Sequence, residues 1–315
     1  MTAEQSPSFA EWPWNADPDG SERRVGVEIE LGGLRVEQTA DIVVQCFGGT
    51  HRPDGPHQLL VEGTEIGDIE IEVDSRFIKQ EKHRELLETL GVDAGSPITE
   101  TVDKWVIEAA SALVPCEIVT GPITLEQMSR LEELRTRLRL AGAEGTAAEP
   151  WYAFGVHFNP TLPGHDADTL LGFLQAFCLL EDWIREDGKV DWSRRISPYV
   201  DPFPDKYRRK VLETEPGLSL EQLIDDYLEL NPSRNRGLDM LPAFSFLDED
   251  RVRAKVEDEL VSKRPTFHYR LADCRVDEPK WTLASEWNRW VAVERLAHDD
   301  ARRRQMIAER LEGRG

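Results

Sequence analysis

The amino-acid sequence predicts an α+β fold in which a mostly antiparallel sheet is backed by helices. Several segments alternate strictly between apolar and polar residues, as half-buried strands do. Segments with helical periodicity separate these strands, but without the regular spacing of βαβ units. The chain has 315 residues, of which 40% are hydrophobic and 31% charged, so we expect a folded core in one large domain or two small ones.

The clearest strand is VGVEIEL, residues 25–31, in which apolar residues alternate with Gly26, Glu28 and Glu30. Glu28 and Glu30 therefore share one face, with roughly 7 Å between them. Two carboxylates at that distance repel each other by about 2 kcal/mol at an effective dielectric constant of about 20. A bound divalent cation would remove this cost. The segment is thus either a metal-binding strand or an acidic strand facing water.

The other elements follow in chain order. Residues 1–21 are acidic and rich in proline, and we expect a flexible tail that Trp12 and Trp14 could dock. Helices are expected at 37–47, 79–90, 99–113, 124–141, 167–186, 218–230 and 283–312, and further strands at 57–63, 67–73, 115–122, 153–160 and 265–271. The helix at 124–141 starts with a capping-box pattern, Thr124 with Gln127.

The remaining segments lack a regular pattern. Residues 189–217 read as irregular, and residues 231–242 as a polar loop or the start of a helix. We find no repeat and no linker, so residues 22–315 are expected to form a single domain that ends in a long amphipathic helix.

Unusual polar residues lie on the strand faces opposite the apolar ones. They are Glu70 and Glu72 (followed by Asp74), Glu117, His157 and Asn159, and His268 and Arg270. For any single strand, a solvated sheet face is the simpler interpretation. Solvated strand faces favour Thr, Ser, Lys and mixed charges, however, whereas acids, histidine and arginine dominate here. Carboxylates and imidazoles bind divalent ions, and arginine binds the phosphates that such ions bridge.

Composition excludes several classes of function. A net charge of −22 repels nucleic acids and anionic lipid, so neither is expected as a partner. The N-terminal segment does not resemble a signal peptide, and the most apolar run, 170–180, is too short to span a bilayer. Four cysteines without a CxxC pair fit a reducing cytoplasm, and Cys116 is expected to be a buried thiol.

Taken together, these segments resemble the amidoligase family of the glutamine synthetase-like carboxylate–amine ligase superfamily. The matching segments, which run in order over about residues 23–297, are RRVGVEIEL, GDIEIEVDS, PCEIVTGP, FGVHFNP, NPSRNRGLDMLP and RPTFHYRL. The resemblance implies a glutamine synthetase-like catalytic domain, in which the concave face of a curved, mainly antiparallel sheet holds ATP and divalent metals. Helices would cover the other face.

The resemblance also implies roles for individual residues. The implied metal ligands are Glu28, Glu30, Glu117, His157 and Glu72. The implied nucleotide-binding residues are His157, Asn159, His268 and Arg270, and the implied catalytic residues are Arg236 and Arg270. Many superfamily members carry an acid two residues before the strand arginine, where this chain has His268. Because a carboxylate is missing at this position, the site would either bind one metal fewer or use His268 as a neutral imidazole ligand. The strand register decides whether Glu70, Glu72 or Asp74 enters the site.

The function implied by the resemblance is an ATP-dependent carboxylate–amine ligase that uses Mg²⁺ or Mn²⁺ and forms an amide through an acyl phosphate. Its substrates would be a small-molecule or peptide carboxylate and an amine. Two alternatives stay open, a phosphotransferase of the same fold and a non-catalytic metal- or nucleotide-binding partner in an assembly. A homo-oligomer and a partner ligase or amidotransferase also stay open, and the sequence identifies neither the substrates nor the general base.

Overall fold

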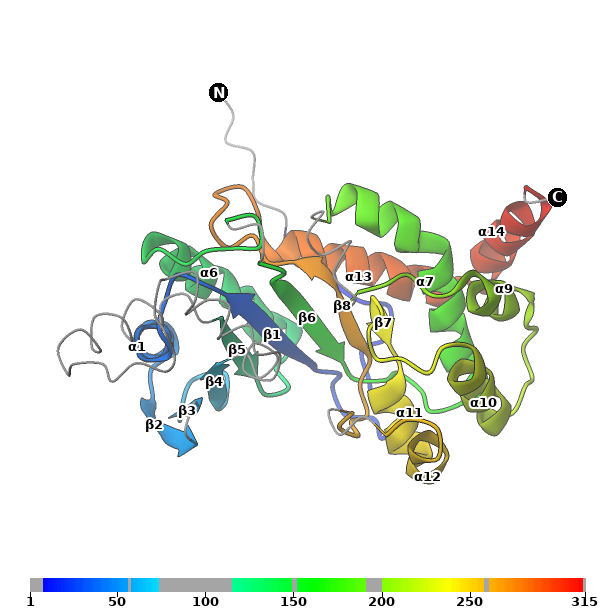
Figure 1. The fold of residues 1–315 in the computed structure, drawn as a ribbon, viewed down its shortest axis with the longest axis horizontal. Coiled ribbons are helices and arrows are strands. Elements are labelled where there is room, and N and C mark those ends of the chain that lie inside the picture. Colours follow the sequence, from blue (N-terminus) through cyan, green and yellow to red (C-terminus); the bar gives the residue numbers. More distant parts are fainter. Residues whose placement is uncertain are drawn as a thin grey trace, which may run out of the picture.

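The computed structural model describes residues 8–55, 58–73, 115–148, 152–190, 200–257 and 261–313. Its strands are β1 (Val25–Leu31), β2 (Thr50–Gly55), β3 (Gln58–Glu62), β4 (Ile69–Val73), β5 (Cys116–Thr120), β6 (Gly155–Pro160), β7 (Leu238–Asp239) and β8 (His268–Asp273). Within the described residues they form an eight-stranded antiparallel sheet in the order β2-β3-β4-β5-β1-β6-β8-β7 (Figure 1). The predicted α+β class with an antiparallel sheet is confirmed.

Two strands were not predicted, and one lies later than predicted. Strand β2 (THRPDG) contains Pro, Asp and Gly and is exposed along its whole length, so neither strand propensity nor alternation marks it. It pairs with β3 at the edge of the sheet. Strand β7 has two residues, too few for a periodic pattern. The strand expected at 265–271 is β8, and it spans His268–Asp273.

The helices are α1 (Val36–Phe47), α5 (Leu125–Ser129), α6 (Leu131–Leu140), α7 (Ala167–Asp187), α9 (Asp205–Glu213), α10 (Leu220–Leu230), α11 (Leu241–Leu247), α12 (Glu249–Arg253), α13 (Leu283–His298) and α14 (Asp300–Glu312). The helices expected at 79–90 and 99–113 lie outside the described residues. Among the described helices, none combines the length and the apolar character that crossing a membrane requires.

Two helices predicted as continuous are each divided. At Arg130 the helix 124–141 breaks into α5 and α6, because i→i+3 hydrogen bonds from Arg130 to Gln127 and from Glu133 to Arg130 tighten the turn. At Asp299 the long C-terminal helix breaks into α13 and α14. The Asp299 backbone leaves the helical region there, and its carboxylate accepts the Arg302 N–H at 3.0 Å as a new N-cap.

A helix, α9, lies within the segment expected to be irregular. Its sequence, DKYRRKVLE, is mostly charged, which hides the helical period. Its buried side chains are Tyr207, Arg208, Val211 and Leu212, and this spacing places them on one helical face. Helix α12 was likewise not predicted, whereas α11 begins at Leu241, inside the segment 231–242 that was expected to be a polar loop or the start of a helix. Sequence periodicity therefore did not reveal α9, although it did reveal the neighbouring helix α10.

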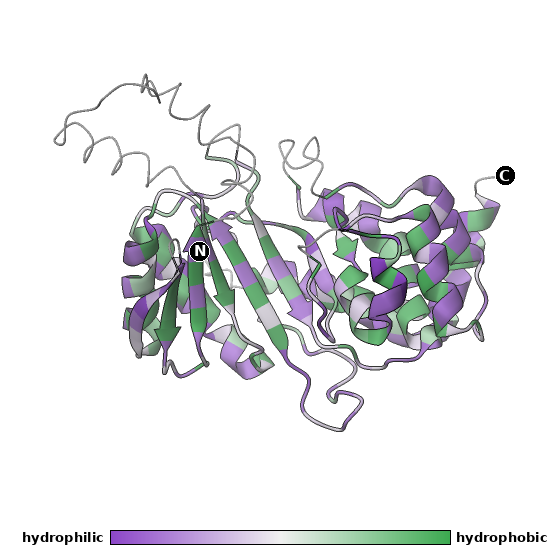
Figure 2. Ribbon diagram, turned by 60° about the horizontal axis from the view of Figure 1, so that its bottom comes forward, coloured by the Kyte–Doolittle hydropathy of each residue, from purple (hydrophilic) through white to green (hydrophobic). Residues whose placement is uncertain are grey.

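The apolar sheet face carries the core. Phe158 of β6 meets Trp287 of α13 at 5.5 Å between ring centroids, and Tyr269 of β8 meets Trp290 at 5.3 Å. Helix α1 packs at the other end of the sheet, against β2, β3 and β4 (Figure 1). The strands show alternating hydrophilic and hydrophobic bands in Figure 2. With the aromatic residues on one face, the acidic residues and histidines lie on the other.

The segment before β1 packs against this core. Trp12 contacts Trp287 at 5.2 Å between ring centroids, and Trp14 stacks on Phe173 of α7 at 5.3 Å. Both tryptophans expected to dock the N-terminal segment therefore do so. The packed part of the chain begins before residue 22.

Thr124 caps α5 as the sequence predicts. Its hydroxyl accepts the Gln127 N–H at 3.2 Å, and the Gln127 side chain accepts the Thr124 N–H at 2.9 Å. We expect Thr124→Ala to lower the free energy of unfolding by about 1 kcal/mol, because a helix N–H loses its acceptor. Urea denaturation measures the change. Thr124→Ser keeps the hydroxyl and is the control, so an equal loss in both variants would contradict the capping role.

Candidate metal site on the polar sheet face

The polar face of the central strands is buried. Strand β1 contributes Glu28 and Glu30, β5 contributes Glu117, β6 contributes His157 and Asn159, and β8 contributes His268 and Arg270. None of these residues is more than 9% exposed. Buried charges must be paired or must bind a metal, so a solvated acidic face does not describe them.

Glu28 is surrounded by hydrogen-bond donors and cationic groups. Its Oε2 is 2.7 Å from His157 Nδ1, and its Oε1 accepts a hydrogen bond from Asn159 Nδ2 at 2.8 Å. Arg264 Nη1 and His268 Nε2 lie 3.6 Å and 3.7 Å away. Burial alone would raise the pKa of Glu28, but His157 and His268 outweigh it and hold the pKa well below its usual range. Glu28 is therefore an ionised carboxylate.

His157 is a neutral imidazole. Burial lowers its pKa well below the usual value, against the opposing effect of Glu28, and Arg270 and His268 lower it further. Because Nδ1 donates its proton to Glu28, the lone pair of His157 is on Nε2. That nitrogen lies 3.6 Å from Glu30 Oε1. Two acceptors that face each other leave a place for a cation.

Glu30, Glu117 and His157 form a compact group whose ligand atoms all lie within 4.8 Å of one another. Pairing of β1 with β5 sets Glu30 directly opposite Glu117. The second oxygen of Glu30 accepts the Gly155 N–H at 2.7 Å, which fixes the carboxylate. Two carboxylates and an imidazole suit a hard or borderline divalent ion.

A second compact group consists of Glu28, His157 and His268, again within 4.8 Å. His157 cannot serve both groups through one lone pair. Since its Nδ1 proton is bonded to Glu28, the second group offers a Glu28 oxygen and His268 Nε2. The resemblance implied that Glu28 and Glu30 are both metal ligands and left the number of ions open, and the structure places them in two neighbouring groups.

The second acidic strand, β4, contributes no residue to either compact group of candidate metal ligands. Glu72 is paired with Glu117 in the β4–β5 register and is half-buried, but it belongs to neither compact group. Glu70 is exposed and accepts a hydrogen bond from Gln58 at 3.0 Å. Asp74 lies outside the described residues.

The two predicted catalytic arginines, Arg236 and Arg270, lie on neighbouring segments of the fold, but their guanidinium groups contact different partners. Arg270 is buried, donates to the Arg234 carbonyl at 2.8 Å, and is near enough to His157 to lower its pKa. Arg236 lies in the segment beside β8, because the Arg270 N–H bonds to Gly237. Its guanidinium binds the Asn231 side chain and lies 3.6 Å from Asp201.

Two residues at the site were not predicted. Asp239 of β7 is the register partner of His268, and its Oδ2 lies 3.5 Å from His268 Nδ1. Arg264 lies beside Glu28, as above. Neither residue belongs to an alternating pattern. The only signal was that both fall inside segments that carry the family resemblance, NPSRNRGLDMLP and RPTFHYRL.

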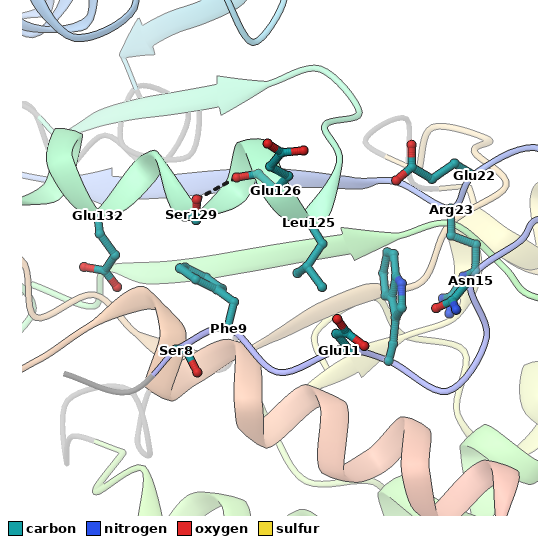
Figure 3. A pocket seen from close by; sticks show the side chains of 11 residues that line it. Ser8, Phe9, Glu11, Asn15, Glu22, Arg23, Leu125, Glu126, Ser129 and Glu132 are labelled. Atoms are coloured by element: carbon teal, nitrogen blue, oxygen red, sulfur yellow. Dashed lines mark hydrogen bonds between the residues drawn. The ribbon is translucent and has the colours of Figure 1, made fainter. Parts of the chain in front are cut away.

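A cavity of about 760 Å³ lies elsewhere, between the N-terminal segment and α5–α6 (Figure 3). Among its lining residues are the acids Glu11, Glu22, Glu126 and Glu132. No candidate metal ligand lines it. Its negative charge opposes a phosphate-bearing ligand, so we place the candidate site on the polar sheet face and not in this cavity.

The fold and site define an α+β protein with buried carboxylates and imidazoles close enough together to hold a metal ion. A family model described as "Putative amidoligase enzyme" matches residues 21–292. The chain belongs to this family, as its ordered motifs predicted, and the family's description suggests an amide-bond ligase. No curated protein and no solved structure matches the chain.

Proposed function

We propose that this protein is an ATP-dependent carboxylate–amine ligase that forms an amide bond through an acyl phosphate. One observation carries the proposal beyond the family's reaction class: Glu30 and Glu117 meet the lone pair of a neutral His157 in a buried group. Such an arrangement is costly without a cation. It supports a metal–phosphate site, which a ligase driven by ATP requires.

The residues present fit a nucleotide with divalent ions. Glu30, Glu117 and His157 would hold one ion, and Glu28 with His268 a second. Mg²⁺ or Mn²⁺ bound with ATP would neutralise the phosphates and polarise the γ-phosphoryl group. Arg270, and Arg264 beside Glu28, add positive charge for the transferred phosphoryl group.

The proposed reaction has two steps. A carboxylate oxygen of the first substrate bonds to the γ-phosphorus of ATP, and ADP leaves. The amine nitrogen then bonds to the acyl carbon, phosphate leaves with the C–O electron pair, and the nitrogen loses one proton. The burial of the site residues supports a site that would limit the access of water to the acyl phosphate.

All four cysteines are free and buried, which supports our placement of the protein in a reducing cytoplasm.

Hydroxylamine tests the proposal directly. The protein is incubated with ATP, Mg²⁺ or Mn²⁺, hydroxylamine and a panel of carboxylates, and hydroxamate, ADP and phosphate are measured. We expect one carboxylate class to give hydroxamate and ADP in equal amounts, because hydroxylamine replaces the amine in the second step. Omission of the carboxylate is the control.

Two other results would overturn the ligase proposal. ADP formed together with a stable phosphorylated product would indicate a phosphotransferase. Metal-dependent binding of ATP without turnover across the panel would indicate a non-catalytic nucleotide-binding protein.

A further inference from the structure

We propose that Asp239 orients His268 as a metal ligand. Because His268 supplies a nitrogen ligand, the position beside Glu28 should bind Mn²⁺ in preference to Mg²⁺. The inference rests on the proposed function, in which the ion at this position is one of two. It assigns a positioning role to Asp239 and a metal preference to the ion at Glu28.

His268 is aimed at Glu28 and has a polar atom without a hydrogen-bond partner. The residue is 5% exposed, and its Nε2 is buried with no hydrogen bond to any residue that the structure describes. That nitrogen lies 3.7 Å from Glu28 Oε2. A buried imidazole nitrogen that faces a carboxylate oxygen at this distance, without a hydrogen bond to it, has the geometry of two ligands of one ion.

Asp239 selects which nitrogen of His268 faces the site. Its carboxylate is 1% exposed, and its Oδ1 is fixed by the Leu241 N–H at 3.0 Å. The other oxygen lies 3.5 Å from His268 Nδ1. This is longer than a hydrogen bond, but a small rotation of the ring would close it when Nε2 binds an ion. A carboxylate at Nδ1 keeps the proton there and leaves the lone pair on Nε2.

The ligand types then decide the metal. Mg²⁺ requires oxygen ligands in near-ideal octahedral geometry, whereas imidazole is a good ligand for first-row transition ions. His268 supplies a nitrogen at a position where a carboxylate would supply an oxygen. The position at Glu28 should therefore favour Mn²⁺.

Metal titration of the full chain with Mn²⁺ alone and with Mg²⁺ alone tests the inference. In the wild type we expect the position at Glu28 and His268 to bind Mn²⁺ more tightly than Mg²⁺, and His268→Glu should reduce the Mn²⁺/Mg²⁺ affinity ratio by at least about tenfold. Asp239→Asn should weaken Mn²⁺ binding by about 10–100-fold, because the orienting charge is lost. His51→Glu is the matched control, since His51 also faces an aspartate, Asp41 at 3.1 Å, but in an exposed pair.

Pulsed EPR of the Mn²⁺-saturated wild type adds a measurement that needs no variant. Nitrogen coupling from two imidazoles is expected, one from His157 and one from His268. Coupling from one imidazole, or an unchanged affinity ratio in a folded His268→Glu variant, would mean that His268 is a cationic partner of Glu28 and Asp239 and not a ligand. These outcomes do not depend on the hydroxamate assay, so the ligase proposal and this inference can fail separately.

Discussion

Glu30→Gln should lower ATP turnover by at least about 10³-fold, which corresponds to roughly 4 kcal/mol of activation free energy. Glu30 is 3% exposed, and its Oε1 faces His157 Nε2 at 3.6 Å, in the group it forms with Glu117. A neutral amide removes one of the two negative charges that would hold the ion. Glu28→Gln should have a similarly severe effect, because it removes the ionised carboxylate at the second group. ADP release in the presence of substrate measures both.

The Glu30→Gln substitution should leave the fold intact. The carbonyl oxygen of the new amide side chain can still accept the Gly155 N–H that Glu30 binds at 2.7 Å, and the metal-free protein loses a like-charge contact with Glu117. We therefore expect its metal-free melting temperature to equal or exceed that of the wild type, while the stabilisation by added Mn²⁺ is reduced. Glu70→Gln is the control, because Glu70 is an exposed acid bonded to Gln58. Near-normal turnover in both Glu28→Gln and Glu30→Gln would refute the metal assignment.

The strands with strict alternation could be predicted because the alternation is local. Residues 25–31 are β1 with the predicted bounds, since each apolar residue faces the aromatic core and each acid faces away. Strand β2 and helix α9 could not be predicted in this way. Strand β2 forms because its backbone pairs with β3, and helix α9 forms because four of its side chains are buried against the core. Both depend on partners that local periodicity does not reveal.

The candidate site likewise has a part that could be predicted from local patterns and a part that could not. The identity of its acids and histidines could be predicted, because each lies on a patterned strand. The contacts between these residues could not be predicted, because they depend on strand pairing. The β1–β6 register sets Glu28 beside His157, and the β1–β5 register sets Glu30 opposite Glu117. Asp239 depends in addition on a two-residue strand, β7. The sequence therefore predicts the chemistry of the polar face, and the pairing of its strands decides how many ions that chemistry can serve.

The buried ion pair between Arg23 and Glu294 should dominate the stability of the N-terminal packing. Arg23 Nη1 and Nη2 bind the two oxygens of Glu294 at 2.8 Å and 3.0 Å, and both side chains are fully buried. Arg23 also donates to the Trp14 and Thr161 carbonyls and lies over the Trp12 ring at 4.2 Å. It thus joins the N-terminal segment, the end of β6 and helix α13.

Removal of either charge leaves the other buried without its counter-charge, so Arg23→Met and Glu294→Gln should each lower the free energy of unfolding by about 3–5 kcal/mol. Urea denaturation measures both. The double variant should lose less than the sum of the single losses, by about 2 kcal/mol, because no unpaired charge remains. Glu133→Gln is the control, since its partner Arg137 lies at 2.8 Å in an exposed pair, and no measurable change is expected there. Strictly additive losses, or single variants as stable as the wild type, would show that the packing of Trp12 and Trp14 holds this segment without the ion pair.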